Sequence, residues 1–512
     1  MRKWLPLVAV CLGSFMLLID VTIVNVALPD MAKDLSTSFS SLQWVVDAYA
    51  LALAALLMGI GGLADLTGHR RIYLIGLAVF ALSSLACGFA PNAAVLIAAR
   101  AVQGVGAAAM FATTFALLNA GYQGKDRGIA YGVWGAVSGA AAAIGPVLGG
   151  ILTQGLNWRW IFFVNLPVSA VAIAVTVVVF VADEVDRSRR LDVAGTLTFT
   201  LFAGALTFAL IRASERGWTS GAVLAVFATS ALALVGFVLA ERLGAHPMFD
   251  LALLRNRSFA GVLVAGLAVN FAAFAALTYA SIWLQSVKLL SPVQAGLTSL
   301  PLSAAAFGVS ALVGRLLHSA RPGPIIGGGL LLVGMGSILD GYLLHAGSSW
   351  PALIPGYILA GLGVGLAIPT LSSSAMAAVP LNRGGMAAGA VNTARQLSFA
   401  IGIAVLGSVF TSRAESSLSA AGATAPSRTA TALSGGQAQR VLATLPTDQR
   451  ARVDALLHAA AVHGLAGALF AAGAVGVAAG LLALLLIRPA KPAPAAPQAT
   501  TKPAYSADPA TG

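Results

Sequence analysis

Apolar residues form long runs along almost the whole chain, separated by short polar or basic segments. A helix needs about 20 apolar residues to cross the hydrocarbon core of a bilayer. Fourteen runs of this length are predicted, at residues 5–28, 42–63, 72–90, 93–118, 128–152, 161–182, 192–212, 220–240, 258–283, 292–317, 324–346, 350–372, 386–411 and 463–487. The pattern predicts an all-α integral membrane protein that crosses the bilayer fourteen times.

Lysine and arginine residues are unevenly divided between the two alternating sets of loops. One set is rich in them, with Arg70, Arg71, Lys125, Arg127, Arg187, Arg189, Arg190, Arg242, Arg255, Arg257, Arg315, Arg321 and Arg383. The short loops of the other set hold only Lys33, Arg159, Arg212, Arg216 and Lys288. Basic residues are enriched on the cytoplasmic side, and an even number of spans places both ends of the chain on one side. We therefore predict a multi-pass protein of the cytoplasmic membrane with both termini in the cytoplasm.

Two stretches near the end of the chain differ from this pattern. Residues 412–462 hold five arginines but are predicted to form an extracytoplasmic loop, because long loops follow the charge rule less strictly. Apolar residues at helical spacing within 437–457 allow a short surface helix there. Residues 488–512 are rich in proline and alanine and are predicted to be a disordered cytoplasmic tail.

The composition agrees with a membrane protein and excludes several other classes. Of 512 residues, 58% are hydrophobic and 9% are charged, whereas soluble domains have about 25% charged residues. The net charge of +12 follows from the basic cytoplasmic loops and needs no nucleic-acid partner. Cys11 and Cys87 fall at different depths, so we expect no disulfide. The sequence contains no phosphate-binding loop, metal-ligand cluster or Ser/His/Asp set, which predicts a protein without cofactor, metal or enzymatic activity.

Two opposite charges are predicted at the same depth inside the membrane. Asp20 lies in the first apolar run, about 22 Å from its inner edge at the rise of a helix. Arg100 enters the fourth run from the outer side and stands about 20 Å from the inner edge. A charge in this position is a functional hypothesis by default, with a purely structural ion pair as the alternative. Equal depth predicts that the two residues pair, and a proton on Asp20 would break that pair.

Further polar residues lie within the other predicted spans. Asp47 is near the outer edge of the second span, where solvent or a substrate could reach it. Asp340 is deep in the eleventh span and is either a proton or cation site or a buried structural carboxylate. Asn392, Arg395 and Gln396 share one face of the thirteenth span because they are three and four residues apart. They either join helices or line a central cavity.

Four motifs in the first half of the chain contain several of these residues. The first is Leu18–Pro29, which holds Asp20, and the second runs from Gly61 to Arg71. The third is Leu96–Gly106, and the fourth has the order G-P-x-x-G-G at Gly145–Gly150. Similar matches occur at 158–167 (WRWIFFVNLP), 191–195 (LDVAG), 291–296 (SPVQAG) and 392–396 (NTARQ). Together they resemble the major facilitator superfamily, and within it the fourteen-span branch of drug:proton antiporters.

The resemblance implies a fold and a set of site residues. The fold would be two six-helix bundles, at 1–182 and 241–487, plus two extra central helices at 183–240. Asp20 and Arg100 would couple protons. The gating motif would be Gly61, Asp65, Gly68, Arg70 and Arg71, and the antiporter motif Gly145, Pro146, Gly149 and Gly150. Candidates for the substrate cavity are Asn25, Asp47, Gln103, Asp340, Asn392, Arg395 and Gln396.

The gating motif departs from the family pattern. Leu66 and His69 stand where basic residues are expected, so weaker gating electrostatics are predicted. The resemblance also places Asp65 against the beginning of the thirteenth span, near Arg383–Met386, in the outward-facing state. There the helix dipole would attract the carboxylate. The alternative is a surface charge at the end of a helix.

The leading functional hypothesis is proton-coupled export of a hydrophobic or amphipathic drug or antibiotic by alternating access. The expected partners are this small molecule, protons and the lipid bilayer, with no nucleic acid, and the functional unit is expected to be a monomer. The alternative is proton-coupled uptake on the same fold, against which the antiporter motif and the fourteen spans argue. A membrane enzyme or a non-transporting sensor is the third class.

Overall fold

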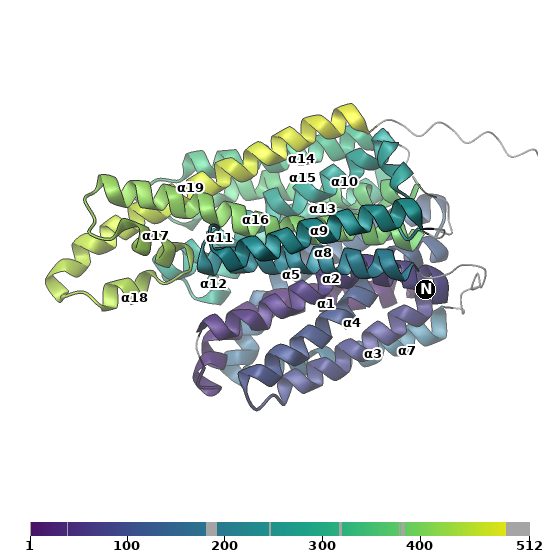
Figure 1. Cartoon of the computed structure of the whole chain (residues 1–512), viewed down its shortest axis with the longest axis horizontal. Coiled ribbons are helices and arrows are strands. Elements are labelled where there is room, and N and C mark those ends of the chain that lie inside the picture. Colours follow the sequence, from purple (N-terminus) through teal and green to yellow (C-terminus); the bar gives the residue numbers. More distant parts are fainter. Residues whose placement is uncertain are drawn as a thin grey trace, which may run out of the picture.

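The structure is a computed structural model that describes residues 2–37, 39–180, 192–244, 247–316, 320–377, 379 and 384–487. Every regular element in these residues is a helix, and the long helices run roughly parallel along the molecule (Figure 1). Thirteen helices of the described chain are long and apolar enough to cross a membrane. The fifth predicted run is also a helix, α5, of 32 residues. Each of the fourteen predicted spans therefore coincides with helical structure.

The first six spans form the N-terminal bundle. Its helices are α1 (Leu5–Asp34), α2 (Phe39–Thr67), α3 (His69–Gly88), α4 (Ala93–Gly121), α5 (Gly124–Gly155), α6 (Trp160–Phe163) and α7 (Asn165–Val179). Helix α1 packs on α5, α7 and α4, so it lies between the other helices of this bundle. Gly68 separates α2 from α3 with φ of 101°, a backbone conformation that favours glycine. This tight turn at Gly68 makes α2 and α3 antiparallel neighbours.

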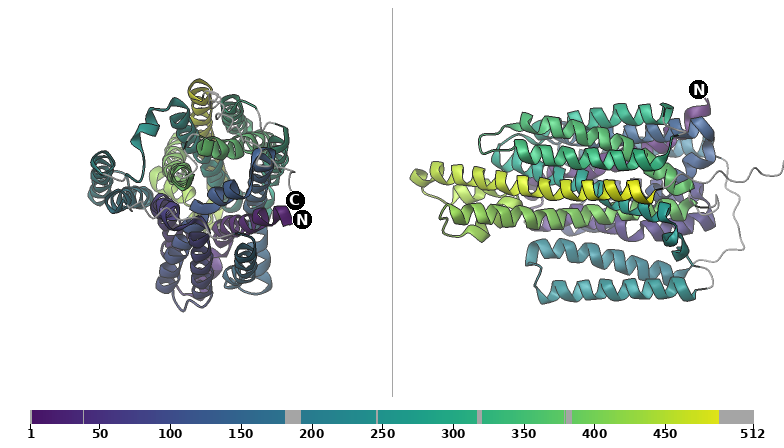
Figure 2. Two further views of the ribbon diagram at one scale, coloured as in Figure 1. Left: turned by 90° about the vertical axis from the view of Figure 1, so that its right-hand side faces the viewer. Right: turned by 90° about the horizontal axis from the view of Figure 1, so that it is seen from above.

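The next two spans, α8 (Val193–Arg216) and α9 (Gly221–Leu243), are the extra pair, which is central in the sequence. They lie side by side along the flank of the molecule (Figure 2). Asp192 begins α8 by accepting the Gly195 N–H at its side chain. Helix α8 packs on α2 and α16, whereas α9 mainly contacts α8 and exposes leucines such as Leu232. An exposed apolar helix on the flank is suited to contact lipid.

The last six spans form the C-terminal bundle. Its elements are η2 (Leu251–Arg255), α10 (Arg257–Val269), η3 (Asn270–Ala275), α11 (Ala276–Ile282), η4 (Trp283–Val287), α12 (Pro292–Leu297), α13 (Leu300–Leu316), α14 (Pro322–Leu343), η5 (Trp350–Leu353), α15 (Ile354–Ala377), α16 (Gly384–Ala420) and α19 (Thr447–Leu486). The ninth span is one continuous helical stretch from α10 to η4, in which η3 and η4 have π-helical hydrogen bonding. Ser291 and Gln294 form a reciprocal capping box that begins α12.

The predicted loop at 412–462 is largely helical, including most of the stretch 437–457 in which the sequence allowed a short helix. Helix α16 continues to Ala420, α19 already begins at Thr447, and α17 (Pro426–Ser434) and α18 (Ala438–Ala443) lie between them. Leu433 and Leu457 are buried in a cluster that also contains Trp283. Apolar contact with the end of the ninth span thus folds this segment against the bundle. The predicted tail at 488–512 lies outside the described residues.

The two ends of the molecule are distinct. One end carries α17 and α18 and is called the cap end here; the other carries the beginning of α1, the end of α19 and the motif residues Arg70 and Arg71, and is called the basic end (Figure 1). The beginning of α1 and the end of α19 lie at the same end of the molecule, as the even number of spans predicts (Figure 1). The two bundles meet mainly where α2 packs on α16 and where α5 packs on α13. The predicted boundary at 182/183 lies outside the described residues and stays a prediction.

Candidate functional site

Asp20 and Arg100 form an ion pair inside the N-terminal bundle. The Arg100 Nη1 atom lies 2.5 Å from Asp20 Oδ2, and both side chains are fully buried. Asp20 comes from the middle of α1 and Arg100 from the second turn of α4. The pairing predicted from equal depth is therefore confirmed as a contact. Its role in proton coupling stays a prediction.

Two amide side chains complete the surroundings of the Asp20 carboxylate. Gln103 and Asn165 both donate to Asp20 Oδ1, at 3.0 and 3.1 Å. Asn165 also donates to Ser84 Oγ, which in turn donates to the Phe162 carbonyl. The carboxylate thus accepts from three side chains on two helices. The buried carboxylate is therefore hydrogen-bonded at both of its oxygens.

The Arg100 guanidinium has other partners besides the carboxylate. Its Nε donates to the Val45 carbonyl at 2.9 Å and its Nη1 to Gln103 Oε1 at 2.8 Å. The guanidinium carbon lies 4.2 Å from the ring centroid of Tyr49, where a cation–π interaction is favourable. Within the described chain Nη2 has no hydrogen-bond partner. Arg100 therefore keeps three partners if Asp20 becomes neutral, although its charge then lacks a counter-ion.

Asn165 is a site residue that the sequence analysis did not single out. It appears there only within the WRWIFFVNLP match, with no role assigned. The signal available in the sequence was an amide side chain near the start of an apolar span. Gln103, predicted to line the substrate cavity, is instead fully buried and bonded to both charges of the ion pair. Its position on α4 one turn after Arg100 explains this, because residues three apart share a helix face.

The antiporter motif packs α5 closely against α1. A Cβ on Gly145 would collide with the Thr22 side chain, and a Cβ on Gly149 would lie 2.9 Å from Ile23 Cγ1 and from its carbonyl oxygen. A Cβ on Gly150 would collide with Val293 of α12. These glycines allow the backbones to approach directly beside the turn of α1 that holds Asp20. The side chain of Pro146 lies outside the described residues.

The gating motif joins the two bundles at the basic end. The Met386 N–H donates to Asp65 Oδ2 at 2.9 Å, and Met386 is the third residue of α16. The predicted placement of Asp65 at the start of the thirteenth span is confirmed. His69 Nε2 lies 3.3 Å from Asp65 Oδ1, so the residue that departs from the family pattern also contacts the carboxylate. Arg70 Nη2 donates to the Val177 carbonyl at the end of α7.

Three polar residues meet at the middle of the C-terminal bundle. Arg395 donates from Nη1 to Asn392 Oδ1 and from Nε to Asn270 Oδ1, both at 3.4 Å. Asn270 begins the π-helical segment η3, and Asn392 is fully buried. This arrangement joins α16 to the ninth span, as one of the two predicted readings requires. Gln396 is partly buried on the same helix.

Asp340 does not lie as deep as the sequence suggested. Helix α14 ends at Leu343, so Asp340 is in its last turn, at the cap end. The reason is that the predicted span was extended to residue 346, beyond the end of the helix. Asp340 Oδ1 accepts the Gly356 N–H at 3.0 Å from the first turn of α15. Asp47 is partly buried on α2. The side chain of Asn25 lies outside the described residues.

A family model now identifies the chain. The model described as Major Facilitator Superfamily matches residues 10–403. The chain belongs to the major facilitator superfamily. The match covers all four motifs of the first half, so the ion pair, the glycines of α5 and the contact of Asp65 are features of a major facilitator. Within the described residues, no group of three or more His, Cys, Asp or Glu side chains could hold a metal ion, and both cysteines are free.

Several curated major facilitators are similar to this one. It is 39% identical over 406 residues to the multidrug resistance protein Stp of Mycobacterium tuberculosis, covering 79% of this chain and 75% of that protein. It is 36% identical to the puromycin resistance protein of Streptomyces alboniger, covering 80% and 82%. It is 30% identical to the tetracenomycin C resistance and export protein of Streptomyces glaucescens, covering 99% and 95%.

A solved structure has the same fold. The human organic anion transporter MFSD10 matches with a TM-score of 0.56 at 15% identity, over 94% of this chain and 99% of that one. At this identity the likeness shows the fold alone. The all-α membrane architecture predicted from the sequence is therefore confirmed for this major facilitator.

Proposed function

We propose that this protein is a proton-coupled antiporter that exports hydrophobic or amphipathic drugs across the cytoplasmic membrane by alternating access. The observation that carries the proposal is the buried Asp20–Arg100 pair, the one fully buried ion pair among the described residues. Relatives over most of the chain are named for resistance to, or export of, drugs and antibiotics. The protein would act as a monomer without enzymatic activity, cofactor or nucleic acid, driven by the proton gradient.

A proton bound to Asp20 changes the forces between α1, α4 and α7. The neutral carboxyl no longer attracts the Arg100 guanidinium, and it accepts more weakly from Gln103 and Asn165. Arg100 keeps Val45, Gln103 and the Tyr49 ring as partners on α2 and α4. Protonation therefore releases α1 while the contact between α2 and α4 remains. The glycine contacts with α5 pass this movement to the helix that packs on α13.

The direction of transport depends on how the basic end and the cap end are oriented in the membrane. With both termini in the cytoplasm, the basic end faces the cytoplasm and the Asp65–Met386 contact holds it closed. Opening toward the cytoplasm breaks that contact and admits the drug. A proton entering from the cap end and leaving at the basic end moves down its gradient. One charge carried across 100 mV contributes about 2.3 kcal/mol.

The test is a toxicity panel in a bacterial host that lacks its own efflux pumps. It spans cationic dyes, quaternary amines and neutral antibiotics. Wild type is compared with Asp20→Asn, and with Asp30→Asn as a control for an exposed carboxylate on the same helix. All variants are compared at matched membrane expression.

We expect wild type and Asp30→Asn to protect against the same compounds, and Asp20→Asn to lose that protection. Equal protection by Asp20→Asn would overturn coupling through Asp20. Increased sensitivity in cells that express wild type would instead favour proton-coupled uptake.

A further inference from the structure

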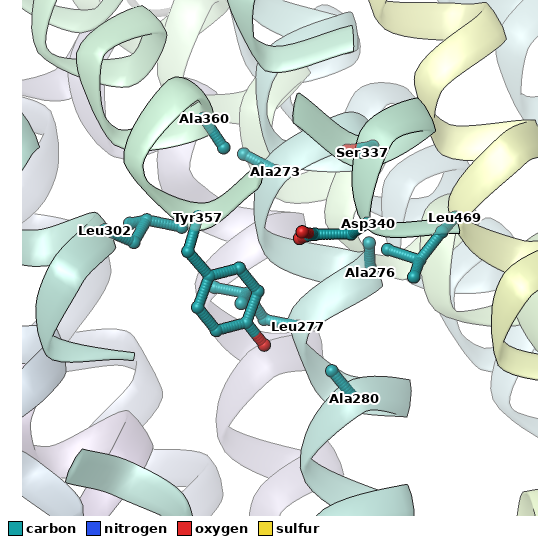
Figure 3. A pocket seen from close by; sticks show the side chains of 10 residues that line it. All are labelled: Ala273, Ala276, Leu277, Ala280, Leu302, Ser337, Asp340, Tyr357, Ala360 and Leu469. Carbon is teal, nitrogen blue, oxygen red and sulfur yellow. The ribbon is translucent and has the colours of Figure 1, made fainter. Parts of the chain in front are cut away.

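A small cavity lies near the cap end of the C-terminal bundle, away from the ion pair of the N-terminal bundle. Ala273, Ala276, Leu277, Ala280, Leu302, Ser337, Asp340, Tyr357, Ala360 and Leu469 line it (Figure 3). The lining is apolar except for two hydroxyls and one carboxylate. Its volume is about 10 Å³, the smallest that accommodates one water molecule. The cavity is therefore too small for a drug.

The Asp340 carboxylate is buried and has one hydrogen-bond donor. Only 2% of the residue is exposed, and Oδ1 accepts from Gly356 at 3.0 Å. No other hydrogen bond or ion pair to Asp340 occurs within the described chain. Gly356 has no Cβ, and a Cβ there would collide with Asp340 Oδ1. The glycine thus lets the carboxylate reach the first turn of α15.

Within the described residues, no cationic side chain forms an ion pair with Asp340. The nearest basic side chain in the sequence, His345 between α14 and η5, is exposed and its Nδ1 contacts the Leu343 carbonyl and Ser348 Oγ. Helices α14 and α15 contain no Lys, Arg or His, and neither do η3 and α11. Helix α19 has none after His463, which is exposed. Helix α13 has Arg315 thirteen residues after Leu302, which is about 20 Å away along a helix. The Tyr357 hydroxyl is the other titratable group of the lining.

A buried carboxylate in this environment requires a compensating species. An ionised carboxylate out of water is costly unless it is paired and fully hydrogen-bonded, and Asp340 has one amide and the dipole of α15. A calcium or magnesium ion takes six or more oxygen ligands, whereas this cavity offers the carboxylate and two hydroxyls. The species that fits both the volume and the donor set is a proton.

We propose that Asp340 is a second proton-binding residue, which is loaded from the cap end and controls the packing of α14 on α15. A proton on Asp340 weakens its attraction for the first turn of α15 and loosens the bundle there. Asp340 is in the last turn of α14, a short path from water at that end. Asp20 and Asp340 lie in different bundles, so each bundle has its own proton-dependent contact. If the protein is a proton-coupled exporter, as proposed above, a second proton per cycle squares the drug concentration ratio that one proton can sustain.

The first experiment detects the proton without any transport. The full-length protein in lipid is titrated from about pH 5 to about pH 9 while the carbonyl stretch of protonated carboxyls is recorded by infrared spectroscopy. Asp340→Asn keeps an acceptor for the Gly356 N–H but cannot bind the proton. Tyr357→Phe and Asp20→Asn are the matched controls. We expect Asp340→Asn to lose one pH-dependent carboxyl band that both controls retain.

An infrared titration of Asp340→Asn identical to that of wild type would overturn the proposal. If Asp340→Asn does not fold, Asp340→Glu replaces it, because it keeps a carboxyl in a different position. The midpoint of the band is then expected to move, and an unchanged midpoint would contradict a site at Asp340. These outcomes do not depend on export. If the protein exports no compound of the panel but shows the Asp340 band, the proposed function is refuted and the second proton site stands.

The second experiment measures protons per drug in proteoliposomes, with a compound taken from the toxicity panel. Wild type is expected to move about two protons per drug molecule and Asp340→Asn about one, with Asp30→Asn, at an exposed carboxylate outside both sites, equal to wild type. Equal stoichiometry in wild type and Asp340→Asn would show that Asp340 takes no part in coupling. That result would overturn the proposed role of Asp340 in coupling protons to drug export.

Discussion

The backbone N–H of Met386 donates to the carboxylate of Asp65 at 2.9 Å, across 321 positions of the sequence. This bond connects the end of α2 to the first turn of α16, where the two bundles meet at the basic end. The carboxylate also faces the positive end of the α16 dipole. His69 contacts its other oxygen, so the lost basic residue of the motif is replaced by a group that can become charged.

Asp65→Asn is expected to loosen this end of the interface. The amide can still accept from Met386, but the attraction of a charge for the helix dipole is lost, which is worth about 0.3–1 kcal/mol. Hydrogen exchange of the peptide that contains Met386 should become up to about fivefold faster. Asp30→Asn serves as the control. An unchanged exchange rate would indicate that the charge of Asp65 does not hold the basic end closed.

Asn165→Ala is expected to lower the stability of the N-terminal bundle. It removes one donor from the buried Asp20 carboxylate and leaves Ser84 Oγ without its donor. Loss of a hydrogen bond to a buried charged group costs about 1.5–3 kcal/mol. Thermal unfolding of the purified variant should therefore begin at a lower temperature. Ser84→Ala, which keeps the Asp20 contact, should have a smaller effect, and equal effects would contradict this ranking.

Gly149→Ala is expected to impair the packing of α5 on α1. The added methyl group would lie 2.9 Å from atoms of Ile23, and such overpacking costs about 1–3 kcal/mol. Gly155→Ala on the same helix is the matched control, because a Cβ there meets no atom within 4 Å. Drug protection should fall in the first variant and remain in the second. Equal protection by both would argue against close α1–α5 packing as a requirement for export.

The Asp34–Arg159 pair predicts a pH dependence at the cap end. Hydrogen bonds from Arg159 and then Trp158 hold the pKa of the Asp34 carboxyl below its usual value. The pair therefore stabilises the protein above the unfolded pKa of about 4 and loses this contribution as the pH falls through the lower folded value. The side chains are partly exposed, so the contribution is below about 1 kcal/mol.

The measurement compares the unfolding temperature of wild type and Asp34→Asn at several pH values. Wild type should be the more stable protein at neutral pH, and the difference should vanish in acid. A difference that stays constant as the pH falls would mean that the ionised carboxylate is not its cause.

Some features of the structure could not be predicted because they depend on contacts between distant segments or on where a helix ends. Residues 412–462 have modest helical spacing by themselves, and it is burial of Leu433 and Leu457 near Trp283 that accompanies their helical structure. Gln103 was named through the resemblance of its motif, and only its hydrogen bonds to Asp20 and Arg100 place it beside the ion pair. Asp340 was placed too deep because an apolar run does not reveal where its helix ends.

The sequence by itself determined the membrane class, the fourteen spans and the location of both chain ends at the same end of the molecule. Run length and loop charge depend on local composition, and the bilayer acts on each run separately. Helical rise along single segments was also enough to match Asp20 with Arg100 in depth. Only the tertiary structure decided that Asn165 donates to Asp20, that Gly145 and Gly149 admit α1, and that Asp340 faces a cavity without a cation. Those relationships depend on how helices rotate and pack against one another, which no single run of residues encodes.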